Sequence, residues 1–207
     1  MDISGSMDPY LTQVKNNIIN IINRMNSDCP GIDINMGYVG YIDHKYFEYN
    51  VNIEFTRDYE DLQNKIKNVT TQLGIPDPPE DIPWGMERAL EKNWKSNARF
   101  AILIADYPCH GYKYHSSDLR DSFPNGDPTR MDIEVLINNM AEKNISLFCM
   151  KITKHTDIMF QIFENIYNSY TNCQFKVVPL ESDVYLSDIV VHHAAKVYVS
   201  QRNIDNN

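Results

Sequence analysis

An aspartate and two serines alternate along the first seven residues, Met1-Asp2-Ile3-Ser4-Gly5-Ser6-Met7. Hard divalent cations such as Mg2+ take oxygen ligands in near-octahedral geometry and give up their waters reluctantly. Gly5 lets the backbone bend, so the carboxylate and the two hydroxyls can turn toward one point. The pattern therefore indicates a cation site. The competing interpretation is that these side chains only cap a helix or stabilise a turn.

A further candidate ligand, Asp106, directly follows an apolar segment in the middle of the chain. This segment, Phe100-Ala101-Ile102-Leu103-Ile104-Ala105, is typical of a strand that is covered on both faces. In open parallel sheets, binding sites gather at the carboxyl ends of the strands. We therefore expect Asp2 and Asp106 to lie at the same edge of one sheet.

The hydrophobic pattern alternates between helical and strand periods along the chain. Helices are predicted over 9–26, 56–73, 81–94, 133–140 and 158–166, and from Leu186 to about Val199. Strands are predicted over 32–42, 51–55, 100–105, 145–150 and 175–178, the first two forming a hairpin. This order predicts an α/β fold with a doubly wound, mostly parallel sheet and helices on both faces. Residues 1–203 are expected to form one domain, and 204–207 a polar tail.

Composition narrows the classes of partner. The chain has 19 Lys and Arg against 28 Asp and Glu, and the net charge of −9 disfavours nucleic acid or anionic lipid as the main partner. No run of about 18 apolar residues is present, so no membrane span is expected. The 4 cysteines are widely spaced without a Cys-x-x-Cys motif, and no signal peptide is visible. We therefore expect a cytoplasmic protein with reduced cysteines.

A long polar loop from Tyr107 to Pro128 contains residues that could do other chemistry. Long loops in compact domains are often functional. Zinc ligands could come from a set close together in the sequence: Cys109, His110, His115 and Asp118. Structural zinc sites usually show paired short spacings, which this set lacks. The competing interpretation is that these side chains pack and hydrogen-bond the loop.

Catalysis can also be considered. Ser4 or Ser6 could pair with His110 and an aspartate, but neither serine lies in a Gly-x-Ser-x-Gly elbow. Metal-assisted hydrolysis would need a base near a metal-bound water, and His110 is the candidate. Both serines are already required as metal ligands in the first interpretation. We therefore expect a binding function rather than an enzyme, with a metal-dependent hydrolase as an alternative.

Several short motifs follow one another in a characteristic order. They are Val39-Gly40-Tyr41-Ile42-Asp43-His44, Phe55-Thr56, Pro79-Glu80-Asp81, Trp94, Ala105-Asp106-Tyr107-Pro108-Cys109-His110-Gly111, Tyr114-His115, Asp118 and Gly126-Asp127-Pro128. Across nearly the whole chain this order resembles a von Willebrand factor A domain. More narrowly, it resembles the A domains of alpha-kinase proteins and of some related intracellular and matrix proteins.

The resemblance implies a metal-ion-dependent adhesion site that binds Mg2+ or Mn2+. Asp2, Ser4 and Ser6 match its first motif, and Asp106 matches an aspartate that usually acts through water. The remaining position is commonly threonine. Here the aligned stretch is Gly74-Ile75-Pro76-Asp77, so Asp77 is expected to take that position, with Asp81 as the alternative. The resemblance further implies a protein partner whose oxygen completes the coordination shell.

In this fold a central strand precedes the first motif, whereas only Met1 precedes Asp2 here. We expect the chain to be part of a longer protein or to have a misassigned start, so that its sheet lacks most of the first central strand. That longer protein could carry a kinase domain, although nothing in this chain resembles a Gly-rich nucleotide loop with its lysine and catalytic aspartate. An alternative function is therefore a structural or regulatory domain of an alpha-kinase-like protein, with metal incidental.

Overall fold

The strands form two separate sheets in the computed structural model, which describes residues 1–28, 32–72, 77–180, 188 and 191–192. Three parallel strands lie in the order β3-β4-β5, and β1 pairs with β2 as an antiparallel hairpin. The strands are β1 (Met36–Gly40), β2 (Val51–Thr56), β3 (Phe100–Ala105), β4 (Ser146–Lys151) and β5 (Phe175–Pro179). The predicted hairpin and the parallel sheet are both confirmed.

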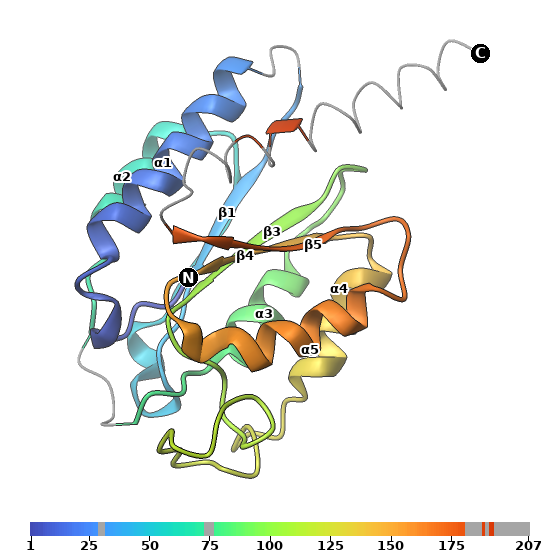
Figure 1. Ribbon diagram of the computed structural model, residues 1–207. Coiled ribbons are helices and arrows are strands. Elements are labelled where there is room, and N and C mark those ends of the chain that lie inside the picture. Colours follow the sequence, from blue (N-terminus) through green and yellow to red (C-terminus); the bar gives the residue numbers. More distant parts are fainter. Residues whose placement is uncertain (29–31, 73–76, 181–187, 189–190, 193–207) are drawn as a thin grey trace.

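The hairpin and the parallel sheet lie side by side as one layer, and helices cover both faces of it, as Figure 1 shows. The α-helices are α1 (Leu11–Asp28), α2 (Tyr59–Lys67), α3 (Ile82–Glu91), α4 (Ile133–Glu142) and α5 (Asp157–Tyr167). The short 3-10 helices are η1 (Gly5–Met7), η2 (His44–Tyr49) and η3 (Lys154–Thr156). Helices α1 and α2 pack on one face, and α3, α4 and α5 on the other. Because neighbouring strand residues point to opposite faces, Ile104 joins the first core, whereas Leu103 and Ala105 join the second.

The α/β class with helices on both faces is confirmed. Besides the division of the described strands into two sheets, the differences from prediction lie at the ends of elements. Strand β1 begins at Met36, four residues later than expected, and α2 ends at Lys67. The predicted helix from Leu186 to Val199 lies almost entirely outside the described residues. Within the part of the chain that the structure describes, no helix combines the length and the apolar character needed to cross a membrane.

The segment Met1–Ser4 joins the hairpin to the parallel sheet. Its backbone donates from Asp2 N to Ile104 O and from Ile3 N to Tyr41 O, each at 2.9 Å. A mostly apolar cavity of about 1110 Å3 lies between β1 and β3, on the N-terminal side of this segment. Its lining includes Met1, Phe100 and Ile102. Between the hairpin and β3 the described strand layer is therefore partial, with only the segment Met1–Ser4 in this position.

The start of α3 is fixed by side-chain capping. The Asp81 carboxylate accepts a hydrogen bond from Trp84 N at 2.9 Å, and proline occupies the first turn. Just before this cap, the backbone of Glu80 pairs with Cys109 after β3, and Glu80 N donates to Pro108 O. The capped helix start thus holds Glu80 at the same edge of the sheet as Asp2 and Asp106.

Gly85 in α3 packs directly on the buried ring of Tyr41. A methyl group at position 85 would lie 2.6 Å from Tyr41 Cδ1. Gly85→Ala should therefore lower the free energy of unfolding by about 1–3 kcal/mol, because the overpacking penalty exceeds the gain in helix propensity of about 1 kcal/mol. Urea denaturation measures this, with exposed Thr12→Ala in α1 as the control. A Gly85→Ala variant at least as stable as wild type would contradict the packing described here.

Candidate metal centre

Asp2, Ser4 and Ser6 are brought together where the central segment meets η1. Asp2 is fully buried, and its Oδ1 accepts a hydrogen bond from Ser4 N at 2.8 Å. Ser4 stands at the N-cap position of η1, yet its side chain makes no capping hydrogen bond. Instead, Ser4 Oγ lies 3.0 Å from Ser6 Oγ. The Ser4 hydroxyl is therefore directed toward the other candidate ligands, and helix capping does not explain its position.

Two further carboxylates complete this cluster. Asp106 follows β3 as predicted, is 1% exposed, and its carboxylate lies near the side chains of Ser6 and Asp2. Glu80 is 4% exposed, and its carboxylate lies near the side chain of Ser4. We refer to Asp2, Ser4, Ser6, Glu80 and Asp106 as the carboxylate cluster. Three acids and two hydroxyls form an all-oxygen donor set, which suits a hard divalent cation.

Burial and mutual repulsion perturb all three acids. Burial and the charge of Asp106 raise the pKa of Asp2 to about 8. Burial, followed by the charges of Asp2 and Asp43, raises the pKa of Glu80 well above its ordinary value. Burial also raises the pKa of Asp106. Without a cation, the raised pKa values favour protons on the cluster near neutral pH, where exposed carboxylates are already ionised.

Each acid of the carboxylate cluster also keeps one oxygen without a hydrogen-bond partner. These buried atoms are Asp2 Oδ2, Glu80 Oε2 and Asp106 Oδ1. An unsatisfied buried carboxylate oxygen is costly, and a bound cation would remove the cost by direct or water-mediated coordination. The residues present therefore suit the divalent cation that the first motif predicts.

The two residues predicted for the fifth ligand position lie in other contacts. Asp77 accepts a hydrogen bond from Ser122 N at 2.7 Å and groups with His110 and Asp121. Asp81 caps α3 and lies 3.0 Å from His44 Nδ1 through its second oxygen. The structure places Glu80, the residue between them, beside Asp2 and Ser4. The residues directly before α3 thus bring Glu80 to the cluster, whereas the resemblance implied Asp77 or Asp81.

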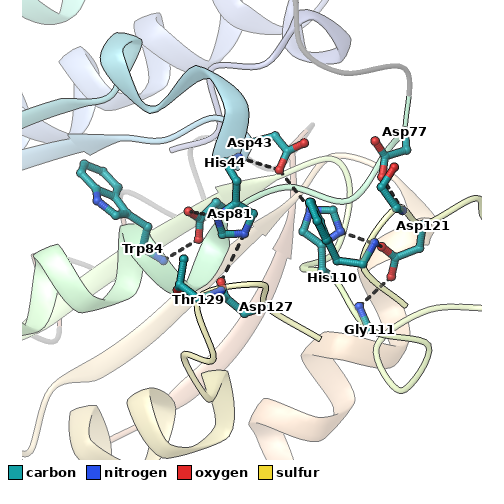
Figure 2. A network of polar contacts seen from close by, with 12 residues as sticks. Asp43, His44, Asp77, Asp81, Trp84, His110, Gly111, Asp121, Asp127 and Thr129 are labelled. Carbon is teal, nitrogen blue, oxygen red and sulfur yellow. Dashed lines mark hydrogen bonds and ion pairs between the residues drawn. The ribbon is translucent and has the colours of Figure 1, made fainter. Parts of the chain in front are cut away.

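A second polar network lies beside the carboxylate cluster and is built around two histidines (Figure 2). His110 Nδ1 lies 2.7 Å from Asp121, and its Nε2 lies 3.1 Å from Asp43. His44 lies between Asp81 and Asp127, at 3.0 and 3.3 Å. This network connects the loop after β3 to η2 and to the start of α3.

The zinc set considered from the sequence is not assembled. Cys109 is a free, buried thiol in the core, where its backbone N donates to Met159 Sδ. Asp118 is exposed and hydrogen-bonds with Ser116. His115 contacts Asp121 instead, at 3.1 Å. Proximity in the sequence was misleading here because the loop turns these side chains in different directions.

The serine–histidine arrangement is also not assembled. Both ring nitrogens of His110 are engaged by Asp43 and Asp121. Ser4 and Ser6 instead contact each other within the carboxylate cluster. A base must lie within hydrogen-bond reach of the proton it removes. His110 therefore does not serve as the general base for either serine in this structure.

Sequence reasoning missed Glu80 and Asp121 as site residues. Glu80 appeared only within the Pro79-Glu80-Asp81 motif, and the cue for its role is the helix cap at Asp81, which fixes its direction. The Asp121 carboxylate is inaccessible to solvent, and it accepts hydrogen bonds from Gly111 N and Phe123 N as well as contacting two histidines. Nothing in the local sequence distinguishes it from the other loop aspartates.

Solved structures with the same architecture include functionally different proteins. A mussel byssus protein, proximal thread matrix protein 1, matches with a TM-score of 0.61 at 15% identity, covering 92% of this chain and 43% of that one. The VWA domain of SpRpn10 matches with a TM-score of 0.58 at 15% identity, covering 88% and 89% of the two chains. The pilus adhesin SpaC of Lactobacillus rhamnosus GG matches with a TM-score of 0.61 at 15% identity, covering 93% and 29%. At this identity the likeness shows the fold alone.

A sequence relative and a family model identify the family. Alpha-protein kinase vwkA of Dictyostelium discoideum is 31% identical over 167 residues, which cover 79% of this chain but only 26% of the kinase. The chain thus spans about a quarter of the length of that relative. The model of the von Willebrand factor type A domain matches residues 1–184. Together with the parallel sheet and its flanking helices, this match shows that the chain belongs to the von Willebrand factor type A domain family.

Proposed function

We propose that this domain is a metal-dependent protein-interaction module. Asp2, Ser4, Ser6 and Asp106 would hold Mg2+ or Mn2+, and Glu80 would take the fifth position. An oxygen from a partner protein would then complete the coordination shell. The observation that carries this proposal is the group of three buried carboxylate oxygens without hydrogen-bond partners, one each from Asp2, Glu80 and Asp106.

The charge of the carboxylate cluster bears on the kind of partner oxygen. Three ionised carboxylates exceed the charge of one divalent cation, which leaves little attraction for a further acid. The cluster would therefore accept a carbonyl or hydroxyl oxygen more readily than a carboxylate. This differs from a site built from one or two acids, where a partner carboxylate is strongly attracted.

The loop from Tyr107 to Pro128 is the element that would shape specificity. It starts directly after Asp106, and the polar network around His110 and Asp121 holds it against the rest of the domain. Tyr112 on this loop is 61% exposed, so it offers an aromatic contact at the surface of the loop. Large exposed aromatic side chains are common anchors in protein interfaces.

The similarity to an alpha-protein kinase supports a second proposal, that the domain acts as a regulatory or structural module of a larger protein. Such a module would bind neighbouring domains through its helix faces and could function without metal. We also propose a cytoplasmic location, since the three cysteines that the structure describes are buried free thiols. The acidic chain favours a protein partner over nucleic acid.

Metal should stabilise the domain in a manner that depends on Asp2. At about a hundred times its dissociation constant, Mg2+ should add about 2.7 kcal/mol, a rise in Tm of very roughly 5–10 °C. Thermal unfolding with EDTA and then with millimolar Mg2+ or Mn2+ measures this rise. The rise should disappear in Asp2→Asn. Equal melting temperatures with and without metal in wild type would argue for the structural module instead.

The metal-free domain should lose stability as the pH rises. The pKa of Asp2 is about 8 in the folded chain, against an ordinary value of 3.8. The folded chain therefore binds the Asp2 proton more tightly than the unfolded chain does. The stability that this proton contributes is fully present below about pH 4 and is lost as the pH rises through about 8. In EDTA, the stability of wild type relative to Asp2→Asn should fall between pH 5 and 8. A pH-independent difference would show that Asp2 is not protonated in the folded domain.

The fifth ligand can be tested by comparing two neighbouring acids. If Glu80 completes the carboxylate cluster, Glu80→Gln should weaken Mg2+ binding, measured by calorimetry, by at least about tenfold, whereas Asp77→Asn should leave it within about twofold. Circular dichroism checks that both variants fold. The opposite order would restore Asp77 to the position that the sequence alignment indicated.

Partner binding should require the metal. Immobilised domain should retain specific proteins from a lysate in Mg2+ and release them in EDTA, and Ser6→Ala, at an exposed position of the carboxylate cluster, should retain less. Thr12→Ala on the outer face of α1 is the matched control. Partners that are retained equally in EDTA and by Ser6→Ala would show that binding uses another surface.

A further inference from the structure

His44 and His110 come from different elements and stack on each other. Their ring centroids are 5.6 Å apart, with an angle of 30° between the planes. His44 begins η2, whereas His110 lies in the loop after β3 (Figure 2). Both are well buried, with the His110 side chain 1% exposed and that of His44 11%. Stacked histidines surrounded by acids either carry protons or share a metal ion.

Asp43 adds an oxygen donor to the histidine pair. One oxygen of Asp43 and one ring nitrogen from each histidine all lie within 4.8 Å of one another. His110 Nε2 is 3.1 Å from Asp43 Oδ1. Two ligands of a tetrahedral zinc ion, each at about 2.0 Å from the metal, lie roughly 3.3 Å apart. The spacing of these donors therefore suits coordination of one small cation.

Asp43 provides an independent indication that a ligand belongs here. The residue is 1% exposed, and its Oδ2 has no hydrogen-bond partner. Its other oxygen, Oδ1, accepts a hydrogen bond from His44 N at 2.6 Å and lies 3.1 Å from His110 Nε2. Because a buried, unpartnered carboxylate oxygen is costly, a cation bound by the Asp43 carboxylate and the histidines would remove a penalty that hydrogen bonds leave in place.

Outer carboxylates orient both rings. Asp121 holds His110 Nδ1 at 2.7 Å and is itself fixed by Gly111 N and Phe123 N. His44 has a carboxylate facing each nitrogen, Asp81 at 3.0 Å and Asp127 at 3.3 Å. Whichever nitrogen of His44 binds a metal, an acid therefore faces the other nitrogen. Metal-binding histidines in proteins are usually oriented in this way.

We propose that Asp43, His44 and His110 form a second cation site, which binds zinc or a similar transition-metal ion. Imidazole nitrogens favour such ions, whereas the carboxylate cluster offers oxygen alone. Asp43, His44 and His110 supply three ligands, and a water molecule would supply the fourth. This site does not depend on the proposed adhesion function, because it shares no ligand with the carboxylate cluster.

The position of the second site indicates what it would do. Its ligands come from the end of the hairpin and from the loop after β3, and its outer acids come from that loop and the cap of α3. A metal ion there would fasten the loop from Tyr107 to Pro128 beside the carboxylate cluster. Because Asp43 lies close enough to Glu80 to raise its pKa, the two sites are neighbours. Zinc would thus fix the shape of the partner-binding surface without contacting the partner.

The competing account is a metal-free network of protonated histidines. Burial alone would lower the pKa of His44, but the neighbouring carboxylates of Asp127 and Asp81 outweigh it and raise the pKa to about 10. In that account, the ion pairs alone hold the loop and added metal finds no site. The two accounts differ in whether the chain binds one equivalent of a transition-metal ion.

Cobalt provides the decisive probe, because tetrahedral Co2+ with nitrogen and oxygen ligands absorbs visible light. Metal-stripped wild type should bind one equivalent of Co2+ with this absorption, and Zn2+ but not Mg2+ should abolish it. His44→Gln and His110→Gln should each lose the absorption. Asp2→Asn, in the carboxylate cluster, and His155→Gln, which stacks on Tyr107 outside the network, should keep it.

Three results would overturn the second site. These are wild type without the absorption, absorption that persists in both histidine variants, and absorption that Asp2→Asn removes. Circular dichroism shows whether the histidine variants fold. If they do not, Asp43→Asn retains an oxygen to accept the hydrogen bond from His44 N, and it should weaken Co2+ binding by at least about tenfold. Undiminished binding by a folded Asp43→Asn would equally contradict the proposal.

Discussion

The rest of the structure depends on the burial of three carboxylates at one edge of the sheet. Asp2, Glu80 and Asp106 are each 4% exposed or less, and their described contacts include serine hydroxyls, backbone amides and one another. Burying several acids together is unfavourable unless protons or a cation neutralise them. The raised pKa values of these acids indicate that protons neutralise them in the absence of metal. The unpartnered carboxylate oxygens mark where a cation would neutralise them instead. The proposed binding function rests on this point, because a cation held in this way would have coordination positions that a partner can fill.

The carboxylate cluster also coincides with the junction between the two sheets. The segment Met1–Ser4 bonds to Tyr41 on the hairpin side and to Ile104 on the side of the parallel sheet. Glu80 reaches the same place through the capped start of α3. Loss of the cluster would therefore affect how the two sheets meet as well as metal binding. The large apolar cavity beyond Met1 makes this junction more important, since few other backbone bonds join β1 to β3 in the described residues.

The sequence was a good guide where a site depends on local spacing. Asp2, Ser4 and Ser6 lie on one turn, and Asp106 follows an unmistakable buried strand, so their convergence could be predicted. The start of α2 and the hairpin could also be predicted, because both leave local signals in the sequence. A polar cap marks the start of α2, and alternating apolar residues mark the strands of the hairpin. The family was also recognisable from the order of short motifs, since that order records the succession of strands and loops.

The sequence was a poor guide where a site depends on how a loop folds back. Which of Asp77, Glu80 and Asp81 reaches the carboxylate cluster depends on the direction of the chain just before α3. The Asp81 cap and the backbone pairing of Glu80 with Cys109 determine this direction. His110 was noticed, but its partner Asp43 lies 67 residues away in the chain. Long-range pairs of this kind leave no periodic signal. The zinc set considered from the sequence is therefore not assembled, and the competing account of side chains that hydrogen-bond the loop fits His110 and His115.

Electron paramagnetic resonance of Mn2+ tests the central claim most directly, because free Mn2+ gives a sharp signal that broadens when the ion binds protein. Titration of the domain should show one bound Mn2+ per chain, which Mg2+ displaces. Asp2→Asn should abolish this binding, and His110→Gln should retain it. Absence of binding at millimolar Mn2+, or binding that Asp2→Asn leaves unchanged, would contradict the assignment of the carboxylate cluster as the metal centre.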